Sequence, residues 1–369
     1  MKNSNINFYS TTISKKSFKY VSETLKSGLI SSGKKNEEFE SELKKFGLVN
    51  PVTLNSGTVT MHLALIASGV GPGDEVIIPS QTFIATGLSV LYTGAKPVFA
   101  DINVFDGNIS IESIKSKINE KTKAIIPVHW GGYPCDLDEI NELSTKYNLS
   151  IIEDAAHAFG ATYKNKLIGG ISRFTSFSFQ AIKHLTTGDG GAICCLNSED
   201  EKLIKKLRWF DIDRENSKTG FLGEREYDAT NIGYKYHMND ISSSLGLGNL
   251  EKIETKLSRI KKISKIYNQN LNKVPGLKLM DYKTDRNSSY WLYPLLVENR
   301  VGFVKKMKEL KIPVSVVHQG IDKNSIFGGK NYNLVNQRFF DENQIHIPIN
   351  DTLSSENINY IVENIKSGW

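Results

Sequence analysis

The feature that most constrains the fold is an alternation of short apolar runs with amphipathic segments through the first 250 residues. The apolar runs are five to seven residues long, rich in Ile and Val, and bounded by Gly, Pro or Asp, as buried strands are. The segments between them, such as residues 58–68 and 137–147, have helical spacing. Strands that are apolar throughout and alternate with helices predict an α/β fold, with a mostly parallel central sheet flanked by helices. The strands of this kind are expected at residues 75–79, 97–101, 124–129, 150–154, 175–179 and 192–196, and a four-residue strand precedes them at 51–54.

The pattern changes near residue 250. Residues 250–274 read as one long charged helix, and shorter elements follow it. These are strands at 290–297 and 314–318 and helices at 302–310 and 354–366. We therefore predict two domains, a large α/β domain over residues 1–249 and a small C-terminal α+β domain over residues 250–369.

Composition excludes several classes of protein. Lys and Arg number 46 against 40 Asp and Glu, so the net charge of +6 is too dilute for a dedicated nucleic-acid-binding protein. The apolar runs are far shorter than a membrane span, and the N-terminus lacks the apolar core of a signal peptide. Three cysteines at positions 135, 194 and 195 provide neither a disulfide framework nor a zinc-ligand spacing. We expect a cytoplasmic protein without a metal, bound neither to a membrane nor to nucleic acid.

Candidate ligand-binding residues follow the predicted strands, because ligands of such sheets bind at the carboxyl ends of the strands. Ser56, Gly57 and Thr58 come directly after the first strand and open a helix, where free N–H groups and the helix dipole favour an anion. A plain helix cap explains these residue types equally well.

Asp154 ends the strand at residues 150–154, and His157 follows it. A buried carboxylate needs a partner, and a protonated pyridine nitrogen is one, although a capping Asp beside a surface His is the alternative. Lys183 lies in an apolar, hydroxyl-rich stretch before a glycine-rich turn, surroundings that lower the pKa of an amine and favour nucleophilic attack on an aldehyde. An anion turn, a strand-end Asp and a buried Lys are together the contacts that pyridoxal 5′-phosphate (PLP) requires.

Longer motifs carry a resemblance over nearly the whole chain. The sequence resembles the DegT/StrS-type sugar aminotransferases, which have the aspartate aminotransferase fold (fold type I). The matching motifs are Ser27-Gly-Leu-Ile-Ser-Ser-Gly33, Asn55-Ser-Gly-Thr58, Gly71-Pro-Gly-Asp-Glu-Val76, Pro79-Ser-Gln-Thr-Phe-Ile-Ala-Thr86, Val128-His-Trp-Gly-Gly132, Glu153-Asp-Ala-Ala-His157, Phe177-Ser-Phe-Gln-Ala-Ile-Lys183, Gly188-Asp-Gly-Gly191, Gly233-Tyr-Lys-Tyr-His-Met-Asn-Asp240 and Ile347-Pro-Ile349.

The resemblance assigns roles to individual residues. It implies that Lys183 binds PLP covalently and moves protons, that Asp154 pairs with the pyridine nitrogen, and that His157 lies near the ring hydroxyl. An aromatic residue at the position of Phe83 stacks on the ring in the family. The phosphate is held by the residues at the positions of Ser56, Gly57, Thr58 and Ser178.

The sequence departs from the family pattern at two positions. Lys235 stands where many members have Asn, and His237 where many have Arg; this segment is where the partner subunit usually reaches the neighbouring site. Lys235 is expected to meet the phosphate and His237 the substrate. His318 matches a substrate-side His, although its sequence context differs and a structural role is the alternative. A dehydratase branch of the family has His in place of the lysine, so Lys183 favours a transaminase.

The resemblance thus implies a homodimeric PLP-dependent aminotransferase with shared active sites. It would transfer an amino group, with glutamate as the expected donor, to a nucleotide-linked keto-sugar for surface polysaccharide or secondary metabolism. Two alternatives stay open: a non-nucleotide cyclic ketone such as a keto-inositol as the acceptor, or a regulatory protein that binds PLP without turnover.

Overall fold

A seven-stranded sheet forms the centre of the computed structural model, which describes residues 6–214, 216–331 and 333–369. The strand order is β1-β9-β8-β5-β4-β2-β3, and only β9 runs antiparallel to its neighbours. The mostly parallel α/β fold is therefore confirmed. The strands are β1 (Pro51–Leu54), β2 (Glu75–Pro79), β3 (Lys96–Ala100), β4 (Thr122–Ile125), β5 (Ser150–Asp154), β8 (Phe174–Ser178) and β9 (Gly191–Cys195).

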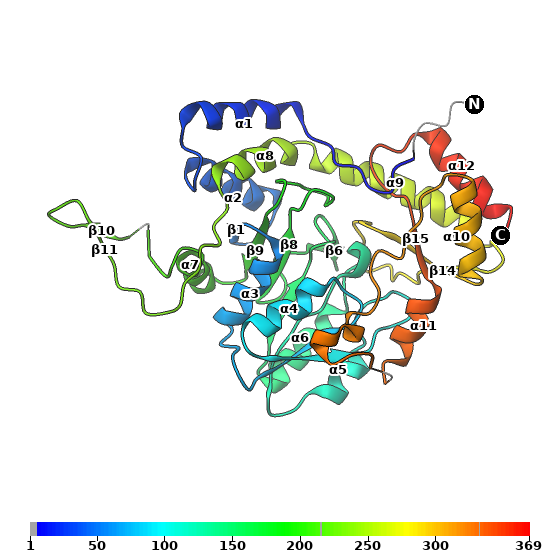
Figure 1. The fold of residues 1–369 in the computed structure, drawn as a ribbon, viewed down its shortest axis with the longest axis horizontal. Helices are drawn as coiled ribbons and strands as arrows, with labels where there is room; N and C mark the ends of the chain where they lie inside the picture. Colours follow the sequence, from blue (N-terminus) through cyan, green and yellow to red (C-terminus); the bar gives the residue numbers. More distant parts are fainter. Residues whose placement is uncertain (1–5, 215, 332) are drawn as a thin grey trace.

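Helices cover both faces of this sheet because its strands bury side chains in both directions. Ile77 and Ile78, neighbours in β2, belong to two separate apolar clusters, as do Cys194 and Cys195 in β9. One cluster includes α2 (Lys34–Phe46), α5 (Ile111–Lys117) and α6 (Leu137–Tyr147). The other includes α3 (Gly57–Ala67), α4 (Ile84–Tyr92) and α7 (Ser198–Leu207). Figure 1 shows α1 (Lys15–Ser27) lying along α8 (Asp240–Leu250) at the edge of the molecule.

A second apolar core lies in the C-terminal part of the chain. A three-stranded antiparallel sheet, β12 (Leu277–Leu279), β14 (Tyr293–Val297) and β15 (Gln344–Ile347), packs against three helices. These are α9 (Ile253–Leu271), α10 (Arg300–Glu309) and α12 (Ser355–Lys366). The C-terminal part of the chain also contacts the part that forms the large sheet, because β13 (Arg286–Asn287) pairs with β6 (Thr162–Tyr163). The division into two domains at residue 250 stays a prediction.

The structure corrects three expected elements. Residues 250–274 are not one helix, because α8 ends at Leu250, a turn follows, and α9 begins at Ile253. Residues 314–318 form no strand: only Ser315 bridges to His346, and Val317 has a left-handed φ of 37° that interrupts extended backbone. For the same reason, the strand expected from residue 290 begins only at Tyr293, since Tyr290 has a φ of 52°.

A hairpin arm projects from the body of the molecule (Figure 1). Its strands are β10 (Lys218–Thr219) and β11 (Arg225–Glu226), and the tip residues Phe221 and Leu222 are 101% and 85% exposed. Among the described residues, the helices are too short or too polar to cross a membrane.

Candidate active site

The predicted ligand-binding residues gather at one edge of the large sheet, as the parallel topology requires. Ser56, Gly57 and Thr58 follow β1, Asp154 ends β5, and Ser178 ends β8. The last two strands are neighbours, with Asp154 opposite Ser176 in register.

Lys183 lies on the loop between β8 and β9; the residue is half-buried, and protein atoms surround its ammonium group. Burial lowers the pKa of Lys183 to about 7, while the negative charge of Asp154 opposes this shift. The Lys183 Nζ lies 3.5 Å from the centre of the Trp291 ring. With this pKa about half of the amines are neutral at pH 7, and the neutral form can act as a nucleophile.

Asp154 is buried but not without partners. The hydroxyl of Thr86 donates to its Oδ2 at 2.8 Å, and the backbone N–H of Ala156 donates to its Oδ1 at 3.1 Å. Burial raises the pKa of Asp154, and these two hydrogen bonds and the charge of Lys183 oppose the rise. A cationic partner would therefore stabilise the carboxylate.

At the turn before α3, the start of this helix approaches the end of β8 closely. Ser56 caps the helix, its side chain accepting a hydrogen bond from the N–H of Val59 at 3.4 Å. A Cβ on Gly57 would lie 2.9 Å from the Cβ of Ser178, so only glycine allows α3 and β8 to meet here. The free N–H groups at the start of α3 and the hydroxyls of Thr58 and Ser178 suit a phosphate.

Aromatic rings form a wall beside Lys183. The His157 ring stacks on Trp291 with their centres 3.8 Å apart, and its buried Nδ1 has no hydrogen-bond partner. His318 lies 6.2 Å from His157 and 5.1 Å from Phe83, measured between ring centres. Phe83 precedes α4 and is 54% exposed, so about half of the residue is accessible to solvent or to a ligand.

Two of these histidines are neutral near pH 7. Burial, reinforced by the charge of Lys183, holds the pKa of His157 well below its usual range. The same causes lower the pKa of His318 to about 4. Neutral rings can either donate or accept a hydrogen bond, which suits contacts with hydroxyl groups.

Sequence reasoning missed Trp291, Trp130 and the role of Thr86. Trp130 lies 5.6 Å from His157 and 5.9 Å from His318 between ring centres, and it is fully buried. Thr86 and Trp130 lie within two motifs of the family resemblance, so the sequence carries a signal for both. Trp291 follows Ser288, Ser289 and Tyr290 without any local chemical signal.

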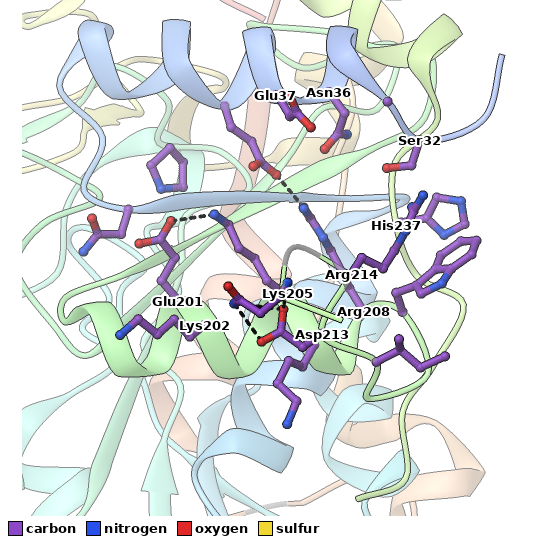
Figure 2. A pocket seen from close by; sticks show the side chains of 18 of the residues that line it. Ser32, Asn36, Glu37, Glu201, Lys202, Lys205, Arg208, Asp213, Arg214 and His237 are labelled. Atoms are coloured by element: carbon purple, nitrogen blue, oxygen red, sulfur yellow. Dashed lines mark hydrogen bonds and ion pairs between the residues drawn. The ribbon is translucent and has the colours of Figure 1, made fainter. Parts of the chain in front are cut away.

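His237 and Lys235 lie in a segment that runs beside the end of β1, where Leu54 bridges to His237. The His237 ring packs against Trp209, with ring centres 4.2 Å apart, and lines a cavity of about 730 Å³ between α2 and α7. Figure 2 shows it beside Arg208 and Arg214. Burial, then the charge of Lys235, lowers the pKa of His237 to about 4.

The backbone of Lys235 lies closer to the predicted phosphate turn. Its carbonyl accepts a hydrogen bond from the Asn55 side chain at 3.5 Å, and the Lys235 side chain is exposed. The expected contacts of Lys235 with the phosphate and of His237 with the substrate remain predictions.

The residues fit PLP on the evidence of their own contacts. Asp154 is a buried carboxylate suited to a cation, and Lys183 is a buried amine. The unpartnered Nδ1 of His157 suits a ring hydroxyl. The start of α3 at Gly57, where it meets Ser178 of β8, suits a phosphate. Fold and site together define a PLP-dependent enzyme of the aminotransferase type.

Comparison with known proteins identifies the family. The chain belongs to the DegT/DnrJ/EryC1/StrS aminotransferase family, which it matches over residues 11–366. It is 33% identical to the spore coat polysaccharide biosynthesis protein SpsC of Bacillus subtilis over 372 residues, covering 96% of this chain and 94% of that protein. It is also 33% identical to the GDP-perosamine synthase of Escherichia coli O157:H7 over 362 residues, covering 97% and 96%.

Solved structures agree with this family. The sugar aminotransferase CalS13 from Micromonospora echinospora superposes with a TM-score of 0.93 at 30% identity, covering 99% of this chain and all of that one. Another similar protein, the putative sugar aminotransferase Spr1654 from Streptococcus pneumoniae, is known in a PLP form and in a pyridoxamine phosphate (PMP) form. This protein is thus a PLP-dependent transaminase.

Proposed function

We propose that this protein transfers an amino group from an amino acid to a nucleotide-linked keto-sugar, with Lys183 as its catalytic residue. The observation that carries the proposal is the buried Lys183 amine at the carboxyl edge of the sheet, with the pKa lowered to about 7 and Asp154 nearby. In the overall exchange the amino acid becomes a keto acid, and the keto-sugar becomes an amino sugar.

PLP, when bound, supplies an aldehyde that accepts the amine and a ring that withdraws electrons from the reacting carbon. Lys183 would hold the cofactor through its amine, and that amine, when free, would move a proton between the carbons that exchange the amino group. Asp154 would pair with the ring nitrogen, and as a carboxylate it would favour a proton there. His157 would contact the ring hydroxyl through its Nδ1, which has no hydrogen-bond partner within the chain.

The sugar class is supported by the names of the relatives. These include a GDP-perosamine synthase and a spore coat polysaccharide biosynthesis protein. Phe83, which is 54% exposed, packs against His318, and the charge of Lys183 acts on His318. We infer that His318 contacts the sugar, and that the amino sugar is used for a surface polysaccharide.

A homodimer is part of the proposal. The hairpin arm and the segment after it expose Phe221, Leu222 and Ile232, the last at 79%, and contact with another subunit would bury these apolar groups. In a dimer with twofold symmetry the contact would be reciprocal, giving two equivalent sites. The segment at residues 233–240 would then bring Lys235 to the partner's phosphate.

Borohydride reduction of the PLP-loaded protein tests the role of Lys183. The pyridoxyl mass should appear on the peptide that contains Lys183. Incubation with glutamate and a panel of nucleotide keto-sugars should convert one of them into a product whose mass corresponds to the amino sugar. A label on another lysine, or none, would contradict the proposal. Asp154→Asn should fold normally and raise the barrier by roughly several kcal/mol.

Subunit mixing tests the shared site. Lys183→Ala protein and Lys235→Ala protein, each weakly active alone, should regain activity together once subunits exchange, because one of the two sites in each hybrid is intact. No recovery despite proven exchange would show that each chain completes its own site.

A further inference from the structure

We propose that residues 289–292 form a positioning clamp for Lys183, with Trp291 as the positioning residue. The inference rests on the proposed role of Lys183 in binding PLP. It concerns a segment far from Lys183 in sequence, which contacts the lysine, both of its chain neighbours, and His157.

The clamp holds the backbone on both sides of Lys183. The indole Nε1 of Trp291 donates to the carbonyl of Ile182 at 3.0 Å. On the other side, the His184 Nε2 is 3.0 Å from the carbonyl of Ser289, to which it donates. Since Ile182 and His184 directly flank Lys183, these two hydrogen bonds fix the position of its Cα.

The same segment also holds His157. The hydroxyl of Ser289 donates to the backbone carbonyl of His157 at 2.9 Å. The Trp291 ring stacks on the His157 ring with 3.8 Å between centres and 18° between planes. Trp291 therefore contacts both the Lys183 amine, at 3.5 Å, and the ring that we expect beside the cofactor hydroxyl.

The clamp itself is fixed at several points. The N–H groups of Ser289 and Leu292 donate to the carbonyls of Gly132 and Gly131 at 3.1 and 3.2 Å. A Cβ on Gly132 would lie 2.5 Å from the Ser289 hydroxyl, so the close approach requires glycine there. Tyr290, between Ser289 and Trp291, has a left-handed φ of 52°, a conformation that persists only where surrounding contacts impose it.

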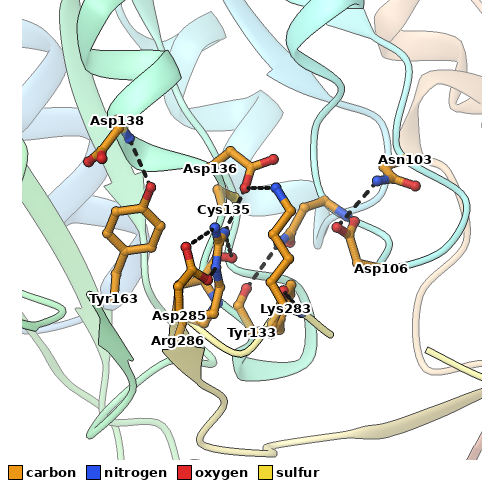
Figure 3. Close-up of polar contacts among 12 residues, drawn as sticks. Asn103, Asp106, Tyr133, Cys135, Asp136, Asp138, Tyr163, Lys283, Asp285 and Arg286 are labelled. Atoms are coloured by element: carbon orange, nitrogen blue, oxygen red, sulfur yellow. Dashed lines mark hydrogen bonds and ion pairs between the residues drawn. The ribbon is translucent and has the colours of Figure 1, made fainter. Parts of the chain in front are cut away.

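An ionic cluster centred on the buried Arg286 holds the chain just before the clamp (Figure 3). The Arg286 guanidinium is 2.8 Å from Asp136 and 2.7 Å from Asp285, and its side chain is almost fully buried. It also donates to the carbonyl of Pro134 at 3.1 Å. Because residues 134–136 follow Gly131 and Gly132, this cluster and the clamp attach to one loop.

The physical need for such a clamp comes from the lysine itself. Its side chain has four rotatable bonds, and a free amine would sample many rotamers. Attack on an aldehyde requires one of them, so restricting the amine before the cofactor arrives speeds covalent capture. The Trp291 face lies against the Nζ itself, where it limits the directions open to the amine.

Rapid mixing of the apoprotein with PLP tests the clamp. Absorbance separates the binding step from the slower covalent step, and a borohydride quench followed by peptide mass analysis reports the link to Lys183. In Trp291→Leu we expect the binding step to keep its affinity within about threefold, because the phosphate turn is untouched, while covalent capture slows at least about tenfold. Trp291→Phe retains a ring but loses the donor to Ile182, and should slow capture by about threefold.

Trp369→Leu is the matched control, because Trp369 packs on Phe303 in the small core, far from Lys183 in the fold. It should leave both steps unchanged. Should Trp291→Leu fail to fold, Trp291→Phe decides alone. Capture at the wild-type rate in the variants that fold, or a fall of affinity, capture and melting temperature in proportion, would overturn the clamp. A wild-type protein that never labels Lys183 would instead overturn the proposed function.

Discussion

The lowered pKa of Lys183 predicts a steep pH dependence of its reactivity in the apoprotein. Burial places this pKa at about 7, against 10.5 for an ordinary lysine. The reactive neutral form should therefore be about a tenth of the molecules at pH 6, half at pH 7 and nine tenths at pH 8. An ordinary lysine at pH 7 is only about 0.03% neutral, so Lys183 should have more than about a thousandfold advantage in reactive form.

The Asp154→Asn variant tests whether the Asp154 carboxylate raises or lowers the pKa of Lys183. The Asp154 carboxylate stabilises the ammonium of Lys183 and so raises its pKa against the larger effect of burial. Its neutral replacement should move the midpoint of reactivity to lower pH, while the apoprotein stays folded.

Trace acetylation between pH 5.5 and 10, with peptide mass analysis, measures this midpoint. The same peptide in the unfolded chain is the matched control, and its midpoint should lie near the ordinary lysine value. A midpoint above pH 9 in the folded apoprotein would show that the ammonium is hydrated, and an upward shift in Asp154→Asn would refute the electrostatic reasoning.

Three further substitutions follow from the packing and charges. Gly57→Ala should weaken PLP binding at least about tenfold in equilibrium dialysis, because its Cβ meets Ser178 at 2.9 Å, whereas Gly71→Ala, with nothing within 4 Å, should not. Arg286→Leu should lower the free energy of unfolding by about 3 kcal/mol in urea, since its two carboxylate partners lose a nearly buried cation. Lys183→Met should stabilise the apoprotein by about 3–5 kcal/mol at pH 6, a gain that shrinks as pH rises from 7 towards 10.5 because the folded lysine is then neutral.

The amino-acid sequence by itself determined the large sheet and the chemistry at its edge. Strands β2 and β5 and helix α6 fall at the expected residues, because their signals are local: an apolar run or helical period, ended by Gly, Pro, Asp or Asn. Lys183 and Asp154 could be singled out for the same reason, since each stands in a short segment whose composition is unusual for a charged residue.

Tertiary structure alone decided what surrounds Lys183. Trp291 reaches the lysine only because the left-handed backbone at Tyr290 ends the expected strand early, and contacts from a distant loop impose that conformation. Val317 turns the chain in the same way before His318. Backbone strain of this kind is stabilised by packing between segments distant in sequence, so no local pattern predicts it.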